Sequence, residues 1–124
     1  MKGLIWNCNQ VEWQNKNEKK FLADCLLVLV CFEKNDTLNT IKEGVRRVNQ
    51  LNKKRYNRTS ISIFPFAHLS KDILNEKDAL EMLNIFFKKI SNHFSEIQQI
   101  PFKIEKEIFF HLLPGKEDVS YFEY

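Results

Sequence analysis

The chain has 124 residues, of which 44% are hydrophobic and 13% aromatic, and its formal net charge is +3. A disordered chain has few aromatic residues and a large net charge, so this composition excludes disorder. No apolar run approaches the roughly 20 residues of a membrane-spanning helix, and the N-terminus lacks the apolar stretch and cleavage site of a signal peptide. We therefore expect residues 1–124 to form a single soluble, cytoplasmic domain without membrane contact.

The N-terminal part of the chain predicts two strands. Apolar residues with polar ones between them indicate a strand over residues 2–6 and its continuation over 8–13. The charged stretch 14–20 predicts a loop. Residues 22–32 form the strongest apolar run, LADCLLVLVCF. Its length and its valine and leucine content are typical of a strand that is buried on both faces.

A helix and a third strand are expected next. Asn35-Asp36-Thr37 has the chemistry of a turn and a helix N-cap. Five apolar residues then recur at three- and four-residue steps, which places them on one face of a helix. These residues are Leu38, Ile41, Val45, Val48 and Leu51. A basic loop over 53–59 ends the helix, and residues 60–64 predict a strand that Pro65 stops.

The C-terminal half predicts a second helix over 78–94, strands over 97–102 and 104–113, and a short final strand over 119–124. The apolar stripe expected on this helix is Leu80, Leu83, Phe87, Ile90 and Phe94. The order of elements predicts an α/β fold, a mixed β-sheet covered by two main helices. The cysteines and histidines lack the spacing of metal ligands, so we expect neither a metal nor a cofactor.

The segment FPFAHLS, Phe64 to Ser70, is the first candidate for a functional site. It lies where a predicted strand ends and leads toward a helix, and open α/β sheets bind their ligands at such strand ends. Pro65 stiffens the segment, and Ala67 is small enough to let a ligand approach the backbone. His68 could position a substrate or exchange a proton near neutral pH. The alternative is a structural histidine that bonds a backbone carbonyl at the end of a strand.

The second candidate lies in IPFKIEKEIFF, residues 100–110. Charged and apolar side chains alternate here, as on a strand. Lys106 breaks this alternation because it falls on the apolar face, where a lysine is costly unless it meets a pocket or an opposite charge. The alternative is a lysine that protects an edge strand from aggregation.

Taken together, these two segments resemble a known family. FPFAHLS followed by a helix, and then Pro101-Phe102 with Lys106 four positions later, is similar to the archaeal-type N-terminal editing domain of threonyl-tRNA synthetase. The resemblance extends over essentially the whole chain, including Val11 to Trp13 and the strand that ends at Phe32-Glu33-Lys34. It implies the fold that this domain shares with D-aminoacyl-tRNA deacylase.

The resemblance also implies a function. Such domains hydrolyse serine wrongly esterified to threonine tRNA and spare the correct threonine, with the terminal 2′-hydroxyl of the tRNA helping to position water. His68 and Lys106 are then the expected catalytic residues, which orient the substrate or the water. The expected substrate-binding residues are Pro65, Phe66, Ala67, Phe32, Phe102, Glu105, Glu117 and Asp118.

Three of these positions depart from the family pattern. Glu105 stands where the family has a tyrosine, and Phe32 is larger than the usual residue. The downstream acid of the family falls on Val119 in an ungapped count, with Glu117 and Asp118 beside it. The amino-acid preference therefore stays open.

The expected partners follow from the same resemblance. They are the terminal adenosine and amino acid of a charged tRNA, a second copy of the chain in a homodimer, and a threonyl-tRNA synthetase catalytic chain, fused or separate. Two other functions remain open, namely a D-aminoacyl-tRNA deacylase and a non-catalytic tRNA-binding module of the same fold.

Overall fold

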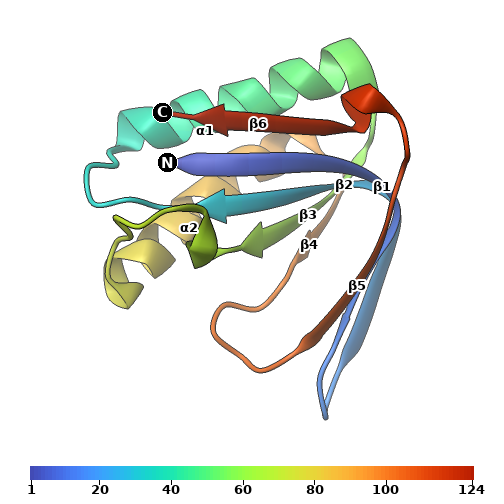
Figure 1. The fold of residues 1–124 in the computed structure, drawn as a ribbon, viewed down its shortest axis with the longest axis horizontal. Coiled ribbons are helices and arrows are strands. Elements are labelled where there is room, and N and C mark those ends of the chain that lie inside the picture. The colour runs from blue at the N-terminus through green and yellow to red at the C-terminus, as the bar shows by residue number, and fades with distance from the viewer.

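A computed structural model, which describes residues 1–124, shows one mixed sheet of six strands (Figure 1). The strand order is β4-β3-β2-β1-β5, and β6 also pairs with β1. The strands are β1 (Lys2–Gln14), β2 (Lys19–Cys31), β3 (Ser60–Pro65), β4 (Glu96–Gln99), β5 (Glu107–Leu112) and β6 (Val119–Glu123). Strands β2, β3 and β4 run parallel to one another, and every pair that includes β1 is antiparallel.

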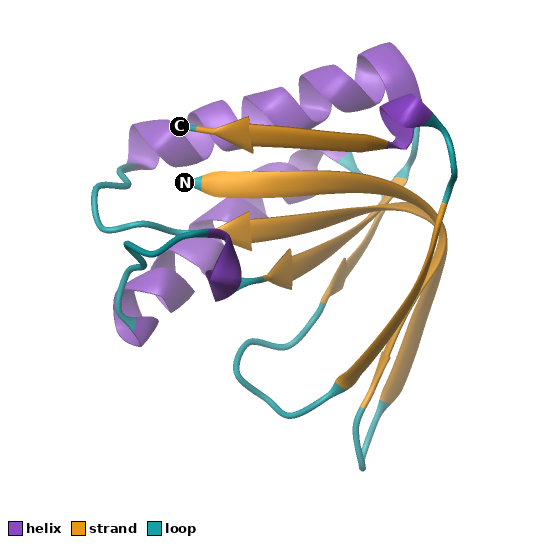
Figure 2. Ribbon diagram, in the orientation of Figure 1, coloured by secondary structure: helices purple, strands orange, loops and turns teal.

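The two helices, α1 (Leu38–Leu51) and α2 (Glu76–Ile90), pack on one face of the sheet (Figure 2). A core of 18 buried residues fills the space between them and the strands. A second cluster of eight buried residues lies on the opposite face, which carries no helix. The mixed sheet with two main helices is thus confirmed. None of the helices is long and apolar enough to span a bilayer.

Strand β2 occupies the centre of the sheet, as its apolar run predicts. It pairs with β1 on one side and with β3 on the other, and residues 25–32 are all buried. The two predicted N-terminal segments form one continuous strand, β1, with a bulge between Cys8 and Gln10. The expected loop over 14–20 is shorter, because Lys19 and Lys20 already pair with Gln14 and Trp13.

The helix boundaries differ slightly from those expected. Thr37 caps α1 by accepting a hydrogen bond from the Thr40 N–H, and the predicted stripe is buried except for Leu38 in the first turn. Helix α2 begins two residues earlier than expected, because Asn75 provides its N-cap, and it ends at Ile90, four residues earlier. Leu80 is exposed, since Leu83, Phe86 and Ile90 form the buried stripe.

The largest departure lies between β4 and β5, where residues 100–106 form a loop and not parts of two strands. The two strands lie at opposite ends of the strand order, so the chain must leave the sheet to connect them. Lys103 adopts a left-handed backbone with φ of 60° within this loop. The alternation that placed Lys106 on a strand's apolar face is therefore wrong, because Lys106 precedes β5.

Gly3 on β1 has no side chain, so the ring of Phe122 can pack directly against its backbone. A substitution at Gly3 therefore tests the packing of β6 on β1. A Cβ atom at Gly3 would lie 2.2 Å from the ring of Phe122, which is buried beneath α1. We expect Gly3→Ala to lower the free energy of unfolding by about 1–3 kcal/mol, measured by urea denaturation. Gly44→Ala is the control, because its Cβ would meet the flexible end of Met1 first and the Phe122 ring only at 3.4 Å, and it should cost less. Wild-type stability of Gly3→Ala would contradict this packing.

Candidate active site

A cavity of about 230 Å³ opens where β2 and β3 end and α2 begins. Its wall is largely apolar and includes five of the residues predicted from the sequence. These five are Phe32, Pro65, Phe66, Ala67 and Phe102. The cavity therefore lies at the carboxyl ends of parallel strands, where α/β sheets bind ligands. Its volume is below the roughly 300–1,000 Å³ of pockets for drug-sized ligands, so it suits one part of a larger substrate.

Backbone hydrogen bonds fasten the FPFAHLS segment to the end of β2. The Phe66 N–H donates to the Val30 carbonyl at 2.9 Å, and the Leu74 N–H donates to the Phe32 carbonyl at 3.1 Å. Between these two bonds the chain makes a short 3₁₀ turn over Ala67–Leu69. The segment that carries Ala67 and His68 is thus held at both ends.

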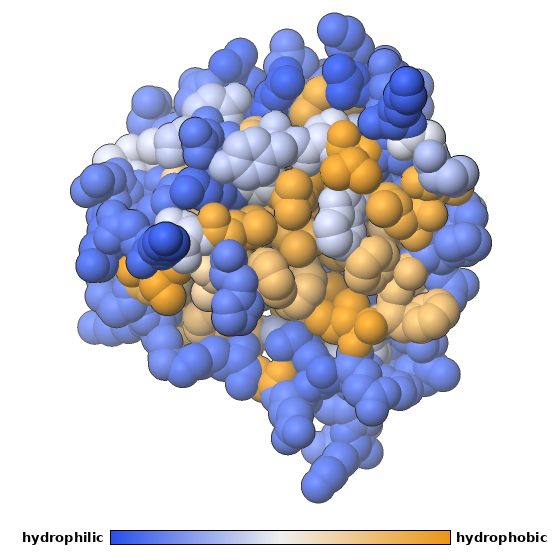
Figure 3. All heavy atoms as spheres, in the orientation of Figure 1, coloured by the Kyte–Doolittle hydropathy of each residue, from blue (hydrophilic) through white to orange (hydrophobic).

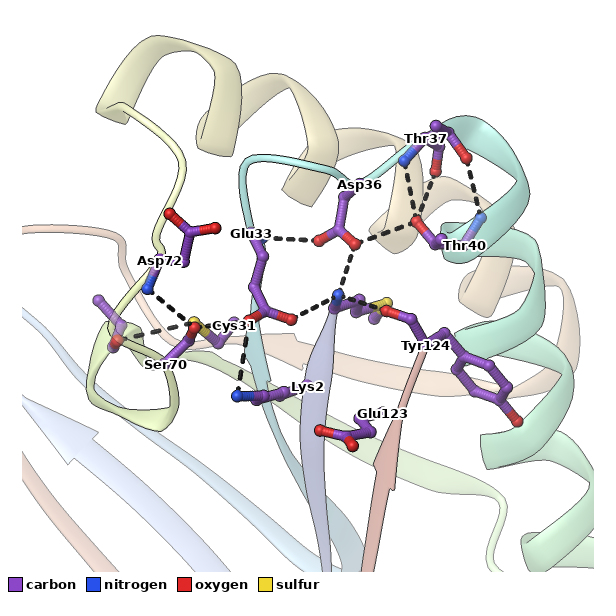
Figure 4. A network of polar contacts seen from close by, with 12 residues as sticks. Lys2, Cys31, Glu33, Asp36, Thr37, Thr40, Ser70, Asp72, Glu123 and Tyr124 are labelled. Atoms are coloured by element: carbon purple, nitrogen blue, oxygen red, sulfur yellow. Dashed lines mark hydrogen bonds and ion pairs between the residues drawn. The ribbon is translucent and has the colours of Figure 1, made fainter.

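A polar network next to the cavity supports the same segment (Figure 4). Glu33, two residues after β2, accepts a hydrogen bond from the Ser70 hydroxyl at 2.5 Å and another from the Met1 ammonium at 2.9 Å. The ammonium also pairs with Asp36, and Lys2 lies 3.6 Å from Glu33. Burial raises the pKa of Glu33, but hydrogen bonds from Ser70 and the ammonium, with nearby positive charge, lower it overall. The ionised carboxylate therefore joins β1, β2 and the FPFAHLS segment.

The two predicted catalytic residues lie along one row of aromatic rings. The ring centroids of Phe64 and Phe66 are 5.4 Å apart, and those of Phe66 and His68 are 5.3 Å apart. The Lys106 Nζ lies 6.0 Å from the centroid of Phe64 and donates to the Ile104 carbonyl at 3.0 Å. His68 is exposed, Lys106 is half-buried, and neither lines the cavity. Phe66 links the two groups to the cavity, because it belongs to both the row and the wall.

Burial lowers the pKa of Lys106. A lysine with a lowered pKa loses its positive charge at a lower pH than an ordinary lysine. The partial burial of Lys106 thus makes its neutral form easier to reach.

The structure does not bring the three predicted acidic residues to the cavity. Glu105 lies beside Lys106 on a separate open hollow. The Asp118 carboxylate accepts hydrogen bonds from the Asn7 side chain and the Gly115 N–H, each at 2.9 Å. Glu117 is exposed and its carbonyl accepts a bond from Tyr56.

Register explains the distance of Asp118 from the cavity. Asn7 pairs with Leu26, four residues before Val30 in the cavity wall. Four residues of a strand span roughly 13 Å.

Eight of the 13 wall residues are not among those predicted from the sequence, and three of the eight, Cys31, Glu76 and Lys103, carry a thiol or a charge. Cys31 donates to the Ala67 carbonyl, with its sulfur 3.6 Å from the oxygen, and burial raises its pKa, so the thiol stays protonated near neutral pH. Glu76 and Lys103 form an ion pair across the mouth of the cavity. No periodicity signals this pair, because 27 positions separate the two residues. No group of three or more His, Cys, Asp or Glu side chains could hold a metal ion.

Residues 1–112 match the family model of the archaea-specific editing domain of threonyl-tRNA synthetase. The chain belongs to this family. An editing domain removes an amino acid from a mischarged tRNA, and this member is accordingly an aminoacyl-tRNA deacylase of the editing-domain family.

Relatives of this editing domain carry the name threonine–tRNA ligase. One, from Methanococcus vannielii, is 29% identical over 119 residues, which cover 82% of this chain and 18% of the relative. Another, from Staphylothermus marinus, is 27% identical over 97 residues, covering 77% of this chain and 16% of the relative. The chain thus spans less than a fifth of the length of these curated relatives.

Two solved structures share the fold of this editing domain. A c-Myc DNA unwinding element binding protein superposes with a TM-score of 0.83 at 12% identity, covering 100% of this chain and 99% of that one. A probable eukaryotic D-amino acid tRNA deacylase superposes with a TM-score of 0.70 at 10% identity, covering 98% and 97%. At these identities the similarity shows the fold alone, and it confirms the expected deacylase-like fold.

Ala67 offers a direct test of the cavity, because its exposed side chain forms part of the wall. We expect Ala67→Leu to fill the mouth and to weaken binding of an aminoacyl-adenosine at least tenfold, which corresponds to roughly 1.4 kcal/mol. Calorimetric titration measures the affinity, and thermal unfolding should be unchanged because the residue is exposed. Ala67→Ser is the control and should bind normally. Wild-type affinity of Ala67→Leu would place the ligand elsewhere.

Proposed function

We propose that this editing domain hydrolyses the ester that joins L-serine to threonine tRNA. The observation that carries this proposal is the apolar cavity that FPFAHLS closes at the ends of β2 and β3 in a member of an editing-domain family. In this proposal the wall formed by Pro65, Phe66 and Ala67 faces the terminal adenosine, while Phe32 and Phe102 surround the aminoacyl group.

The proposed chemistry needs little from side chains, because an aminoacyl ester is already an activated acyl group. The terminal 2′-hydroxyl of the tRNA lies next to the ester, so holding the two in a productive geometry supplies proximity. Backbone N–H groups of the FPFAHLS segment stabilise the developing oxyanion. His68 and Lys106, at the two ends of the aromatic row, orient the substrate or the attacking water.

We propose that the limited volume beside Phe32 makes the site prefer serine over threonine. Phe32 is buried, and its ring lies 6.3 Å from that of Phe86 in an edge-on contact, so it has little room to move. One extra methyl group in a tight apolar site changes specificity by roughly 10–200-fold. Rejection of threonine therefore requires only that its methyl group meets this rigid wall.

The proposed partners include a second copy of the chain and a synthetase. Figure 3 shows apolar side chains gathered on the face of the sheet that carries no helix. Partly buried side chains on this face include Leu4, Trp6, Phe64, Phe66, Leu69 and Leu112. An apolar patch of this kind is typical of an interface, which supports the proposed homodimer. The synthetase relatives support action with a threonyl-tRNA synthetase catalytic chain, and we propose that both act in the cytoplasm.

Single-turnover deacylation of threonine tRNA tests the proposed reaction. We expect fast loss of L-serine, with L-threonine lost at least tenfold more slowly, since a methyl group in an apolar pocket is worth at least that factor. A D-aminoacyl-tRNA is assayed in parallel. Loss of the D-ester alone would instead assign a D-aminoacyl-tRNA deacylase, and loss of none would indicate a tRNA-binding module.

Lys106→Ala tests the role of the half-buried lysine. We expect the rate of serine removal to fall roughly 100-fold, the lower end of the range for a lost proton-transferring group. Stability should change little, because the only hydrogen bond of the ammonium is to the Ile104 carbonyl. Lys103→Ala in the same loop is not a suitable control, because Lys103 lines the cavity. Lys16→Ala, on the hollow next to Lys106, serves instead. Unchanged rates in Lys106→Ala would remove this residue from the site.

A further inference from the structure

We infer that Glu76 binds the α-ammonium group of the aminoacyl ester, and that Lys103 occupies the same carboxylate when no substrate is bound. The inference rests on the proposed function, because it assigns a ligand to the cavity described above. Recognition of the α-ammonium distinguishes a tRNA that carries an amino acid from one that carries none. This is separate from the discrimination between serine and threonine, which depends on the amino-acid side chain.

The wall of the cavity provides one carboxylate. Ten of the 13 residues that line it are hydrophobic. Only two of the 13, Glu76 and Lys103, carry a charge at neutral pH. An aminoacyl ester carries an ammonium group one carbon from the scissile carbonyl. A cation that enters an apolar cavity without a partner pays a large desolvation cost. The ammonium is therefore directed to Glu76.

Glu76 lies where its carboxylate can meet the ammonium of a substrate that enters the cavity. It is the first residue of α2, and Lys103 reaches it from the loop between β4 and β5. Both side chains remain more than half exposed, at 65% and 58%. An exposed ion pair contributes little stability, so an incoming ammonium can displace Lys103 at low cost.

Exchange of partners also accounts for release of the product. Hydrolysis adds water across the ester and gives free serine, which keeps the ammonium group, and a tRNA end that has none. Once serine has left, Glu76 is free to pair with Lys103 again. The left-handed backbone of Lys103, beside Phe102 in the wall, keeps this competing cation at the mouth. The Glu76 carboxylate thereby favours the charged tRNA over the uncharged one, and Lys103 competes with the substrate ammonium for it.

Binding of two adenosine derivatives tests the inference. One is seryl-adenosine with an amide in place of the ester, and the other is the same compound without the α-amine. We expect the wild-type protein to bind the amine-bearing compound roughly tenfold more tightly, as one charge-assisted hydrogen bond provides. Glu76→Gln should bind both compounds about equally, while Lys103→Gln should keep the preference because Glu76 remains.

Glu81→Gln is the matched control, since it removes an exposed carboxylate from the same helix outside the cavity. It should keep the tenfold preference. The inference is overturned if Glu76→Gln keeps the preference, if Lys103→Gln loses it equally, or if the wild-type protein binds neither compound. A wild-type protein that binds with the preference but deacylates no aminoacyl-tRNA would support this inference and defeat the proposed function. Deacylation of seryl-tRNA by a protein that shows no preference for the amine-bearing compound would support the proposed function and overturn this inference.

Discussion

The parallel pairing of β2 with β3 is the constraint on which the site depends. Val30 lies opposite Pro65, and the bond from the Phe66 N–H to the Val30 carbonyl continues the pairing past the end of β3. Because both strands are parallel, the segments that follow them leave the sheet at the same edge. The cavity is the space between these segments and the first turns of α2. A different register would separate Phe32 from FPFAHLS and abolish the wall.

Two environments of opposite character meet at this edge. The cavity is apolar, whereas the network around Glu33 is ionic and fixes the FPFAHLS segment from behind. Rigid support of this kind keeps a site in place without taking part in the reaction. The groups proposed to act on a substrate lie outside this network. His68 and Lys106 flank the aromatic row, and Glu76 pairs with Lys103 at the wall of the cavity.

Part of the candidate site could be predicted from the sequence because short motifs carry it. FPFAHLS and the later Pro101-Phe102 contain four of the five predicted residues that line the cavity, namely Pro65, Phe66, Ala67 and Phe102. The strand assumed around Lys106 was wrong, because alternation in sequence cannot show that a chain must cross from one side of a sheet to the other. A count along the chain leads to Val119, with Glu117 and Asp118 beside it, but such a count carries no information about the register of β6 on β1.

The sequence by itself determined the order of the strands and helices, although not the loop over residues 100–106. The apolar run of β2, the helical periodicity of α1 and the turn chemistry at Thr37 are local patterns, and local patterns are fixed by side-chain spacing. Only the tertiary structure decided which distant residues meet. The pairing of Glu76 with Lys103 and of Glu33 with Ser70 joins positions 27 and 37 apart. Such contacts depend on how strands align and where loops cross, and these are properties of the packed chain as a whole.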